Sequence, residues 1–553
     1  MLEIERKLRA GEDTLLSKGI QEYSMSNHVA NLIGSQPWLL PTFAAPAHLQ
    51  VYDLRGASRD ELHTATAAAG IINRSQCQIY LVTSEDELFW LEQVFTAIPH
   101  TQVNMQGSAA LHELLANHVA MFKGLIVYDP ALPDTINVAT TMAGLQDGLC
   151  VSPALAEMLQ TKLGLPLLTD LRRYGWRNRL QAYQWAQEHL QPLCSTHVIA
   201  GLDPGAFCGL RSFLVACRAF IYWLDSRKYL PASNAKISER SLFKRILSFY
   251  PVGSVHMGWV VHEQSAVSMA SHIGMTVVAS DYALNMEVWS AMQTERTPRP
   301  PRKVERIQPH KEKIYLSLTM SDGDNIQYCQ HRLRQLWQDP ARGSLPLGWG
   351  LPPVLLQAAP AMADYYLRTA TENDEIMAGP SGLGYIYPSC WPKSHIEPFV
   401  QQTGSLMQDF GMTTLDILDV DPVFRTGLPL IARFSFRGMQ FTNAALQRLF
   451  AQQLADYGVT GILSGSGYTG RPGHWRYQGD FPIYHHLGFT FSVDRTVKMI
   501  KFASRIFRQR PLFLSVYLIA WNMTPSDAKQ VIDQLGAEYE LVLPSTLLSL
   551  LPK

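Results

Sequence analysis

The amino-acid sequence predicts an α/β protein, in which an N-terminal α/β region with parallel sheets precedes a (β/α) barrel-like C-terminal domain of about seven or eight strands. Three observations lead to this prediction. Short apolar runs of strand length alternate with longer helical stripes along most of the chain. A proline-rich, basic segment interrupts this alternation at residues 294–312. The chain has 553 residues, which is enough for at least two hydrophobic cores.

The N-terminal region, residues 1–293, carries weak signals at first and a regular alternation from residue 49 onward. Residues 49–54 read as a strand and residues 58–73 as a helix. Ser58 is placed to cap this helix, and Glu61 three residues later completes a capping box. Further strand-like runs lie at residues 78–83, 124–128, 148–152, 197–202, 255–261 and 275–279, and helical patterns at 153–163, 178–190 and 238–249. Such alternation predicts parallel sheets covered by helices, with several small lobes as one arrangement.

The segment 294–312 is predicted to be a stiff, solvated linker, because four prolines lie among mostly basic residues. The C-terminal domain, residues 313–553, opens with a clear strand at 313–320. Asp324 or Asn325 can cap the helix that follows. Strand and helix patterns then alternate to the end of the chain, as a (β/α) barrel requires.

Composition excludes several classes of partner. Lysine plus arginine equals aspartate plus glutamate, at 47 each, so net charge gives no reason to expect nucleic acid or an anionic membrane. No apolar run approaches the length of about 20 residues that spans a bilayer. Residues 1–16 lack the apolar core of a secretory signal, so we expect a cytoplasmic protein. The seven cysteines include no CxxC pair and are expected to be free thiols. The oligomeric state cannot be predicted.

The stretch Gly379–Pro388 is the most distinctive in the chain. It follows a short apolar run, so a strand ends where its three glycines and two tyrosines begin. Glycine lets the backbone approach a ligand closely, while Tyr385 and Tyr387, two positions apart, can present their rings on one side of an extended chain. This combination suits a sugar ring, and we include Ser381 and Gly384 in the expected contact surface.

Carboxylates recur where the predicted strands end, which is where barrel enzymes gather their active sites. Asp322 is the first candidate for a catalytic or ligand-binding carboxylate. Asp324 is a second, with helix capping as its alternative role. Asp419 and Asp421 lie two apart before a proline, so a turn is as good an explanation as a site. Glu263 is the best candidate in the N-terminal half; it could reach across a domain cleft, or simply occupy the first turn of a helix.

Aromatic and polar side chains accompany these carboxylates along the predicted rim. The expected substrate-binding residues, besides those of the glycine-tyrosine stretch, are Trp349, Asp374, His474, Trp475, Trp521 and Asn522. Paired carboxylates with aromatic platforms are what glycoside hydrolysis requires.

Metal and cofactor sites have weaker support, and neither is expected. His474, His485 and His486 could join Asp322 around a divalent ion, but no HxxxH or HxH spacing is present. Asp322-Gly-Asp324 is also a DxD triplet, as in glycosyltransferases that hold a metal-bound nucleotide sugar. Residues 465–470 match GxGxxG without a helix after them, so a loop over the site is preferred to a dinucleotide site.

These motifs together make the chain resemble a known family. Gly382-Leu-Gly-Tyr-Ile-Tyr-Pro388 resembles the signature of the GxGYxYP family, which is classed among glycoside hydrolases. Other matching segments are Ser321–Asn325, Gly348-Trp349 with Pro352 and Pro353, Asn373-Asp374, Asp53–Gly56, Gly70–Arg74, Ile136–Ala139 and Ser280-Asp281 with Asn285. The resemblance spans nearly the whole chain and implies a hydrolase that acts on carbohydrate.

We therefore expect hydrolysis of a glycosidic bond in an oligo- or polysaccharide. Asp322 would be one carboxylate of the pair, and Asp324, Asp419, Asp421 or Glu263 the other. Two alternatives stay open. One is metal-dependent removal of acyl groups from a polysaccharide, and the other is a carbohydrate-binding protein without catalytic activity.

Overall fold

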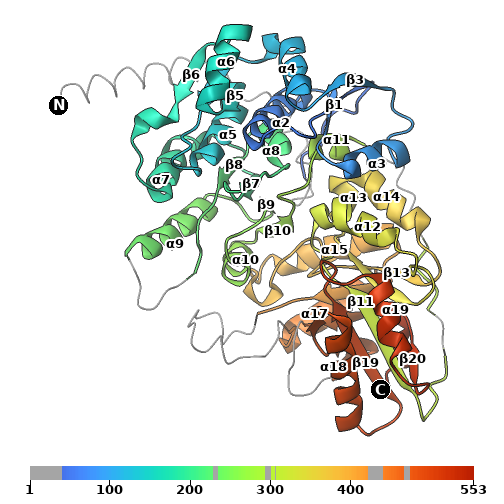
Figure 1. The fold of residues 1–553 in the computed structure, drawn as a ribbon. Coiled ribbons are helices and arrows are strands. Elements are labelled where there is room, and N and C mark those ends of the chain that lie inside the picture. Colours follow the sequence, from blue (N-terminus) through green and yellow to red (C-terminus); the bar gives the residue numbers. More distant parts are fainter. Residues whose placement is uncertain (1–39, 228–233, 293–299, 305–306, 421–439, 466–473) are drawn as a thin grey trace. The chain divides into compact units, whose positions relative to one another are not determined.

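The computed structural model describes residues 40–227, 234–292, 300–304, 307–420, 440–465 and 474–553. Contacts divide the chain into a unit of residues 1–39 and a unit of residues 40–553, and all that follows concerns the second unit (Figure 1). It contains four sheets. Three small sheets belong to the N-terminal half and one ten-stranded sheet to the C-terminal half. This is the predicted fold class.

The three N-terminal sheets are all parallel, in the strand orders β2-β1-β3, β5-β4-β6 and β10-β9-β7-β8. Their strands are β1 (Leu49–Asp53), β2 (Ile79–Val82), β3 (His100–Gln106), β4 (Gly124–Val127), β5 (Gly148–Val151), β6 (Leu167–Asp170), β7 (Val198–Gly201), β8 (Phe220–Tyr222), β9 (Val255–Gly258) and β10 (Thr276–Ala279). In the last sheet β10 is an edge strand.

Helices connect these strands, as parallel pairing requires. They are α2 (Arg59–Asn73), α3 (Glu85–Gln93), α4 (Ser108–Asn117), α5 (Thr135–Gln146), α6 (Pro153–Leu163), α7 (Arg179–His189), α8 (Arg211–Cys217), α9 (Asn234–Leu247), α10 (Glu263–His272) and α11 (Met286–Ala291). The capping box predicted for α2 is present: the Glu61 backbone N–H bonds the Ser58 side chain, and the Ser58 backbone N–H bonds the Glu61 carboxylate.

The C-terminal sheet has the order β16-β17-β15-β14-β13-β12-β11-β19-β18, with β20 also on β11. It is parallel except for the β16–β17 pair. The strands are β11 (Ile314–Met320), β12 (Leu347–Leu351), β13 (Asp374–Ala378), β14 (Thr414–Ile417), β15 (Gly461–Ser464), β16 (Trp475–Gln478), β17 (Phe481–His485), β18 (Phe489–Thr490), β19 (Leu512–Leu518) and β20 (Tyr539–Leu541). The backbone N–H of His486 bonds to β15 and that of Leu487 bonds to β19. The segment between β17 and β18 therefore connects the two sides of the curled sheet.

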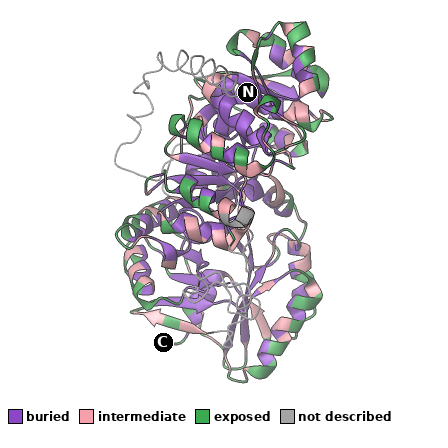
Figure 2. Cartoon of the chain, turned by 90° about the vertical axis from the view of Figure 1, so that its left-hand side faces the viewer, coloured by how far each residue is buried: buried purple, intermediate pink, exposed green. Residues whose placement is uncertain are grey.

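Helices cover this sheet too, and the buried strands lie between helices with exposed outer faces (Figure 2). They are α12 (Leu333–Trp337), α13 (Leu355–Ala358), α14 (Pro360–Thr369), α15 (Ile396–Phe410), α17 (Ala444–Ala455), α18 (Val493–Ile506), α19 (Pro525–Asp533) and α20 (Pro544–Leu550). Within the described ranges, every helix is too short or too polar to span a bilayer. The seven cysteines are free, as expected.

The backbone after β11 lies against the ends of the next two strands through three glycines. A Cβ on Gly379 would lie 2.0 Å from the carbonyl oxygen of Gly323, and one on Gly323 would lie 2.7 Å from Gly350. No side chain fits at these points. The glycines therefore bring the ends of β11, β12 and β13 together at the mouth of the sheet.

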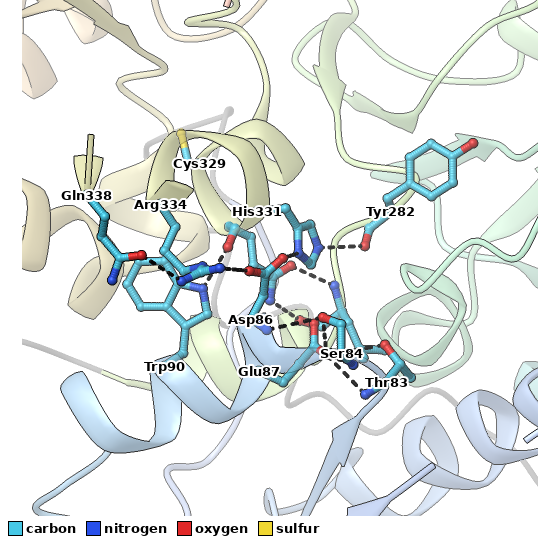
Figure 3. Close-up of polar contacts among 12 residues, drawn as sticks. Thr83, Ser84, Asp86, Glu87, Trp90, Tyr282, Cys329, His331, Arg334 and Gln338 are labelled. Atoms are coloured by element: carbon cyan, nitrogen blue, oxygen red, sulfur yellow. Dashed lines mark hydrogen bonds and ion pairs between the residues drawn. The ribbon is translucent and has the colours of Figure 1, made fainter. Parts of the chain in front are cut away.

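A short π-helix, η5 (Tyr328–Arg332), joins the two halves of the described unit. Its His331 contacts Asp86 of α3 through Nδ1 at 2.8 Å, and Arg334 donates to the same carboxylate (Figure 3). Gln330 exchanges two hydrogen bonds with the backbone of Leu284, both 2.9 Å. Trp90 donates its indole N–H to the Gln330 carbonyl at 2.7 Å. The helix that follows the Asp322 loop is thus anchored to the N-terminal half.

This contact predicts a pH-dependent stability. Burial lowers the pKa of His331, but the hydrogen bond and charges of Asp86 and Glu87 outweigh it and leave the pKa raised above 6.5. The stabilisation is therefore complete below about pH 6.5 and is lost as pH rises through the raised value. We expect Asp86→Asn to reduce the difference between the melting temperatures at about pH 6 and pH 8, measured by calorimetry. Asp533→Asn, which removes an exposed pair with Lys529, should leave that difference unchanged. An unchanged difference in Asp86→Asn would contradict this account.

Candidate functional site

Asp322 lies directly beyond β11 and is held by three elements. Its backbone is left-handed, with φ at 70°, a conformation that aspartate tolerates better than most residues. Its Oδ1 accepts the indole N–H of Trp521 at 3.0 Å, and its Oδ2 accepts the Ser321 hydroxyl. Burial raises the pKa of Asp322, while the bonds from Ser321, Trp521 and the Ala520 backbone oppose the rise. The donors orient this carboxylate and favour its ionised form.

Asp324 does not cap the helix that follows it. The side chain of Asn325 accepts the Tyr328 backbone N–H at 2.9 Å and caps the helix instead. No side chain of the described ranges donates a hydrogen bond to Asp324. Burial, followed by the charges of Asp322 and Glu263, raises the pKa of Asp324 well above its usual value. This carboxyl therefore holds a proton more tightly than its neighbours do.

Glu263 brings a third carboxyl from the N-terminal half. It is the first residue of α10, and its Oε1 accepts the hydroxyl of Tyr385 at 2.6 Å. Burial raises the pKa of Glu263, the bond from Tyr385 lowers it, and the charge of Asp322 raises it, with a net rise. Glu263 therefore begins a helix and also contacts the C-terminal half.

Asp322, Asp324 and Glu263 form one acidic cluster, which we call the carboxyl site. The charges of Asp322 and Glu263 both raise the pKa of Asp324, and the charge of Asp322 also raises the pKa of Glu263. Within the described ranges, no lysine or arginine pairs with any of the three. Titratable groups with raised pKa values and no structural ion pair are typical of functional sites. The environment separates the carboxyls: the pKa of Asp324 is raised well above its usual value, while the pKa values of Asp322 and Glu263 are raised.

An exposed aromatic ring borders the carboxyl site. Trp521 is 46% exposed although its indole N–H is fixed on Asp322, and its ring packs edge-on against Tyr328 at 6.0 Å. Asn522 beside it is also exposed. A flat apolar face fixed next to a carboxylate is the arrangement by which proteins hold sugar rings.

The signature tyrosines do not form the exposed platform that the sequence suggested. Tyr385 and Tyr387 are 1% and 0% exposed and pack into the core of the N-terminal half. Their hydroxyls lie 3.2 Å apart, so the predicted placement on one side is present. As a correction, both rings are buried in this core, and the Tyr385 hydroxyl reaches the site through Glu263.

Four more expected contact residues serve the fold instead. Asp374 begins β13 at the end opposite the site and accepts bonds from Arg342 at 2.7 Å and from Trp349 at 2.9 Å. Both oxygens of Asp374 are occupied, and the Trp349 ring is fully buried. Ser381 exchanges two hydrogen bonds with the Leu418 backbone. Gly384 lies against Thr276, where a Cβ would approach to 2.5 Å. None of the four faces the carboxyl site.

The second half of the predicted rim is only partly described. The Asp419 carboxylate accepts the Ser389 backbone N–H at 3.0 Å and the Ser389 hydroxyl at 2.6 Å, so it connects its loop to the segment that follows the signature. Asp421 lies outside the described residues, as do residues 466–470 of the predicted loop. Trp475 stacks on Tyr484 and donates to the Pro552 carbonyl at 3.0 Å, so it belongs to a separate apolar cluster.

The three histidines do not converge. His474 stacks on His485 with ring centroids 6.0 Å apart, and burial followed by the neighbouring His474, Arg476 and His486 lowers the pKa of His485 to about 4. His486 instead contacts the Ser515 hydroxyl at 2.9 Å. Among the residues that the structure describes, no group of three or more His, Cys, Asp or Glu side chains is arranged to hold a metal ion.

One buried carboxylate was not selected as a site residue from the sequence. Asp416 of β14 accepts the Tyr517 hydroxyl at 2.6 Å and lies 3.7 Å from His486. Its charge contributes to the raised pKa of Asp324. It is the only charged residue in an otherwise apolar and β-branched strand, and this was the signal available in the sequence. Asp416 therefore lies beneath the carboxyl site as part of its electrostatic environment.

Three domain models of one family match the chain. Residues 312–551 match the model described as "GxGYxYP putative glycoside hydrolase C-terminal domain". Residues 196–291 match the "GxGYxYP third domain" and residues 122–194 the "GxGYxYP_N second domain". The chain belongs to the GxGYxYP family. Tyr385, Asp322 and Glu263 thus come from its C-terminal and third domains, which meet at the carboxyl site.

A solved structure shares the fold. The "putative hydrolase from Bacteroides thetaiotaomicron VPI-5482" superposes with a TM-score of 0.75 at 21% sequence identity, over 92% of this chain and 95% of that chain. No curated protein matched the sequence. The comparisons therefore establish the family and the fold, and the chemistry must be argued from the site itself.

The raised pKa of Asp324 predicts that its neutral replacement stabilises the protein. Above pH 3.8 the unfolded chain releases this proton while the folded protein retains it, so folding is increasingly penalised as pH rises. We expect Asp324→Asn to raise the melting temperature at neutral pH by roughly 2 °C, and the gain to shrink toward pH 4. Asp364→Asn, at an exposed position on α14, should show no such gain. A destabilised Asp324→Asn at neutral pH would indicate an ionised, partnered carboxylate instead.

Proposed function

We propose that this protein hydrolyses a glycosidic bond of an oligo- or polysaccharide at the carboxyl site. One observation carries the proposal: Asp322 of the C-terminal domain and Glu263 of the third domain both raise the pKa of Asp324, and within the described residues no lysine or arginine pairs with any of the three. Glycoside hydrolysis needs one carboxylate and one carboxylic acid at the scissile bond, and such a cluster supplies both. The family description and the exposed Trp521 next to Asp322 support a carbohydrate substrate.

The electrostatics divide the roles among the three carboxyls. Asp322, with its donors, is the ionised group that attacks the anomeric carbon or activates water. Glu263 comes from a different domain, and its raised pKa suits a general acid that gives its proton to the leaving oxygen. Asp324 retains its proton and donates a hydrogen bond to a sugar hydroxyl. Trp521 provides the face on which the sugar rests.

This assignment predicts distinct kinetics for two variants. Asp322→Asn should reduce turnover by roughly 10³-fold on any substrate, because the carboxylate acts in the chemical step itself. Glu263→Gln should lose roughly 10²- to 10⁴-fold on glycosides with poor leaving groups and far less on 2,4-dinitrophenyl glycosides, which need no proton. The measurement is kcat/KM over a panel of aryl and natural glycosides.

The matched control is Asp480→Asn, at an exposed carboxylate paired with Lys553, which should behave as the parent protein. If Asp322→Asn binds and turns over substrate normally, the proposal is wrong. If the parent protein binds oligosaccharides tightly and hydrolyses none of the panel, the protein is a binding protein and the catalytic assignment fails.

A further inference from the structure

The family signature lies against α10 and β10 of the third domain, the same unit that carries Glu263. Tyr385 pairs with Val277 on the open edge of β10 through two backbone hydrogen bonds of 2.8 and 3.0 Å. Gly384 permits this pairing because a Cβ there would lie 2.5 Å from the Thr276 methyl group. Gly382 has φ at 126°, which a side chain would strain. Gly384 thus serves the contact with the third domain, while Gly382 lies against Thr403 and Phe399 of α15.

The second signature tyrosine, Tyr387, contacts α10. The backbone N–H of Tyr387 bonds the Ser271 hydroxyl at 3.0 Å, near the end of that helix. Glu263 begins the same helix, so the signature contacts both the strand and the helix that fix its position. These contacts thereby fix the position of Glu263, in the third domain, relative to the signature loop of the C-terminal domain.

The tyrosine hydroxyls complete this contact. The Tyr385 hydroxyl donates to Glu263 at 2.6 Å and lies 3.2 Å from the Tyr387 hydroxyl. The two rings pack edge-on with centroids 5.5 Å apart, and both are buried. Buried aromatic rings are rigid, so they position a hydroxyl more closely than an exposed side chain does.

We propose that Tyr385 and Tyr387 of the signature are positioning residues that hold Glu263 of the third domain at the carboxyl site, opposite Asp322. The inference rests on the proposed function for the catalytic meaning of Glu263. It gives the signature a task that neither its sequence nor the family description states: it assembles one active site from two domains.

The groups that face Glu263 set the sign of the expected effects. They are Tyr385 and Tyr387 of the signature and Asp322 and Asp324 of the β11 loop. At the start of α10, next to Glu263, His262 contacts Ser265. The charges of Arg227 and Asp225 act on the pKa of His262. Tyr385 is the donor that favours the ionised form of Glu263. Removing its hydroxyl must therefore raise the pKa of Glu263 further.

The test is Tyr385→Phe, which removes one oxygen and keeps the ring. A general acid works only while it is protonated, so the alkaline limb of the kcat/KM profile should move to higher pH, while kcat/KM at the optimum should fall roughly tenfold. A merely structural loss would lower activity without moving the limb upward. Tyr484→Phe, which removes a buried hydroxyl bonded to the Phe513 carbonyl, should leave the limb in place. An unmoved limb in Tyr385→Phe overturns the proposal.

A second readout needs no turnover, so it distinguishes failure of this inference from failure of the proposed function. Because the folded pKa of Glu263 is raised, stability falls as pH rises above 4.5. Tyr385→Phe should steepen that fall in the melting temperature, and it should have no such effect in the Glu263→Gln background. An equal effect in both backgrounds overturns the positioning role. If no glycoside is hydrolysed but the steepening depends on Glu263, the positioning role stands and the hydrolase assignment fails.

Discussion

The architecture of the site depends on the open edge of β10. An edge strand presents unpaired N–H and C=O groups, which must be covered or paired. Two segments of the C-terminal domain occupy this edge: Tyr385 of the signature pairs with Val277, and Asn325 of the β11 loop forms a bridge with Ala279. The two segments that carry the conspicuous motifs are therefore neighbours because both lie on a strand of another domain. The carboxyl site forms where they meet.

Electrostatics explain why such an arrangement must be held from outside. Three half-buried carboxyls repel one another when ionised, and no lysine or arginine of the described residues pairs with them, so the cluster opposes its own assembly. The close approach of Gly323, Gly350 and Gly379 and the bonds of η5 to the N-terminal half supply the opposing stabilisation. The result is a graded set of acids in which Asp324 holds its proton most tightly. A gradient of this kind allows one site to hold an acid and a carboxylate at the same pH.

The sequence predicted the parts of this structure that depend on local chemistry. Alternating patterns identified the parallel α/β architecture, and Ser58 with Glu61 identified the start of α2. Asp322 and Glu263 were correctly placed beyond a strand and at a helix start, and the structure brings both into one cluster with Asp324. Their catalytic roles remain predictions.

The errors arose where burial depends on elements distant in sequence. Two tyrosines two residues apart predict a common face but not what covers it, and here the hydrophobic core of the N-terminal half does. Asp374 is the first residue of its strand, so it lies at the far end of the sheet, where Arg342 and Trp349 donate hydrogen bonds to it. Asp324 and Asn325 were equal candidates for the cap, and only the geometry of Tyr328 decides between them.

The central claim is that carboxyls from two domains share one site in different protonation states. An atomic-resolution crystal structure at neutral pH tests it most directly, because the two C–O bonds of a carboxyl are unequal when it is protonated and equal when it is ionised. The account predicts unequal C–O bonds in the Asp324 carboxyl and equal C–O bonds in the Asp322 carboxylate. It also predicts that Glu263 lies beside them and is hydrogen-bonded to Tyr385. Equal bonds in Asp324, or a Glu263 turned away from Tyr385 into solvent, would contradict it.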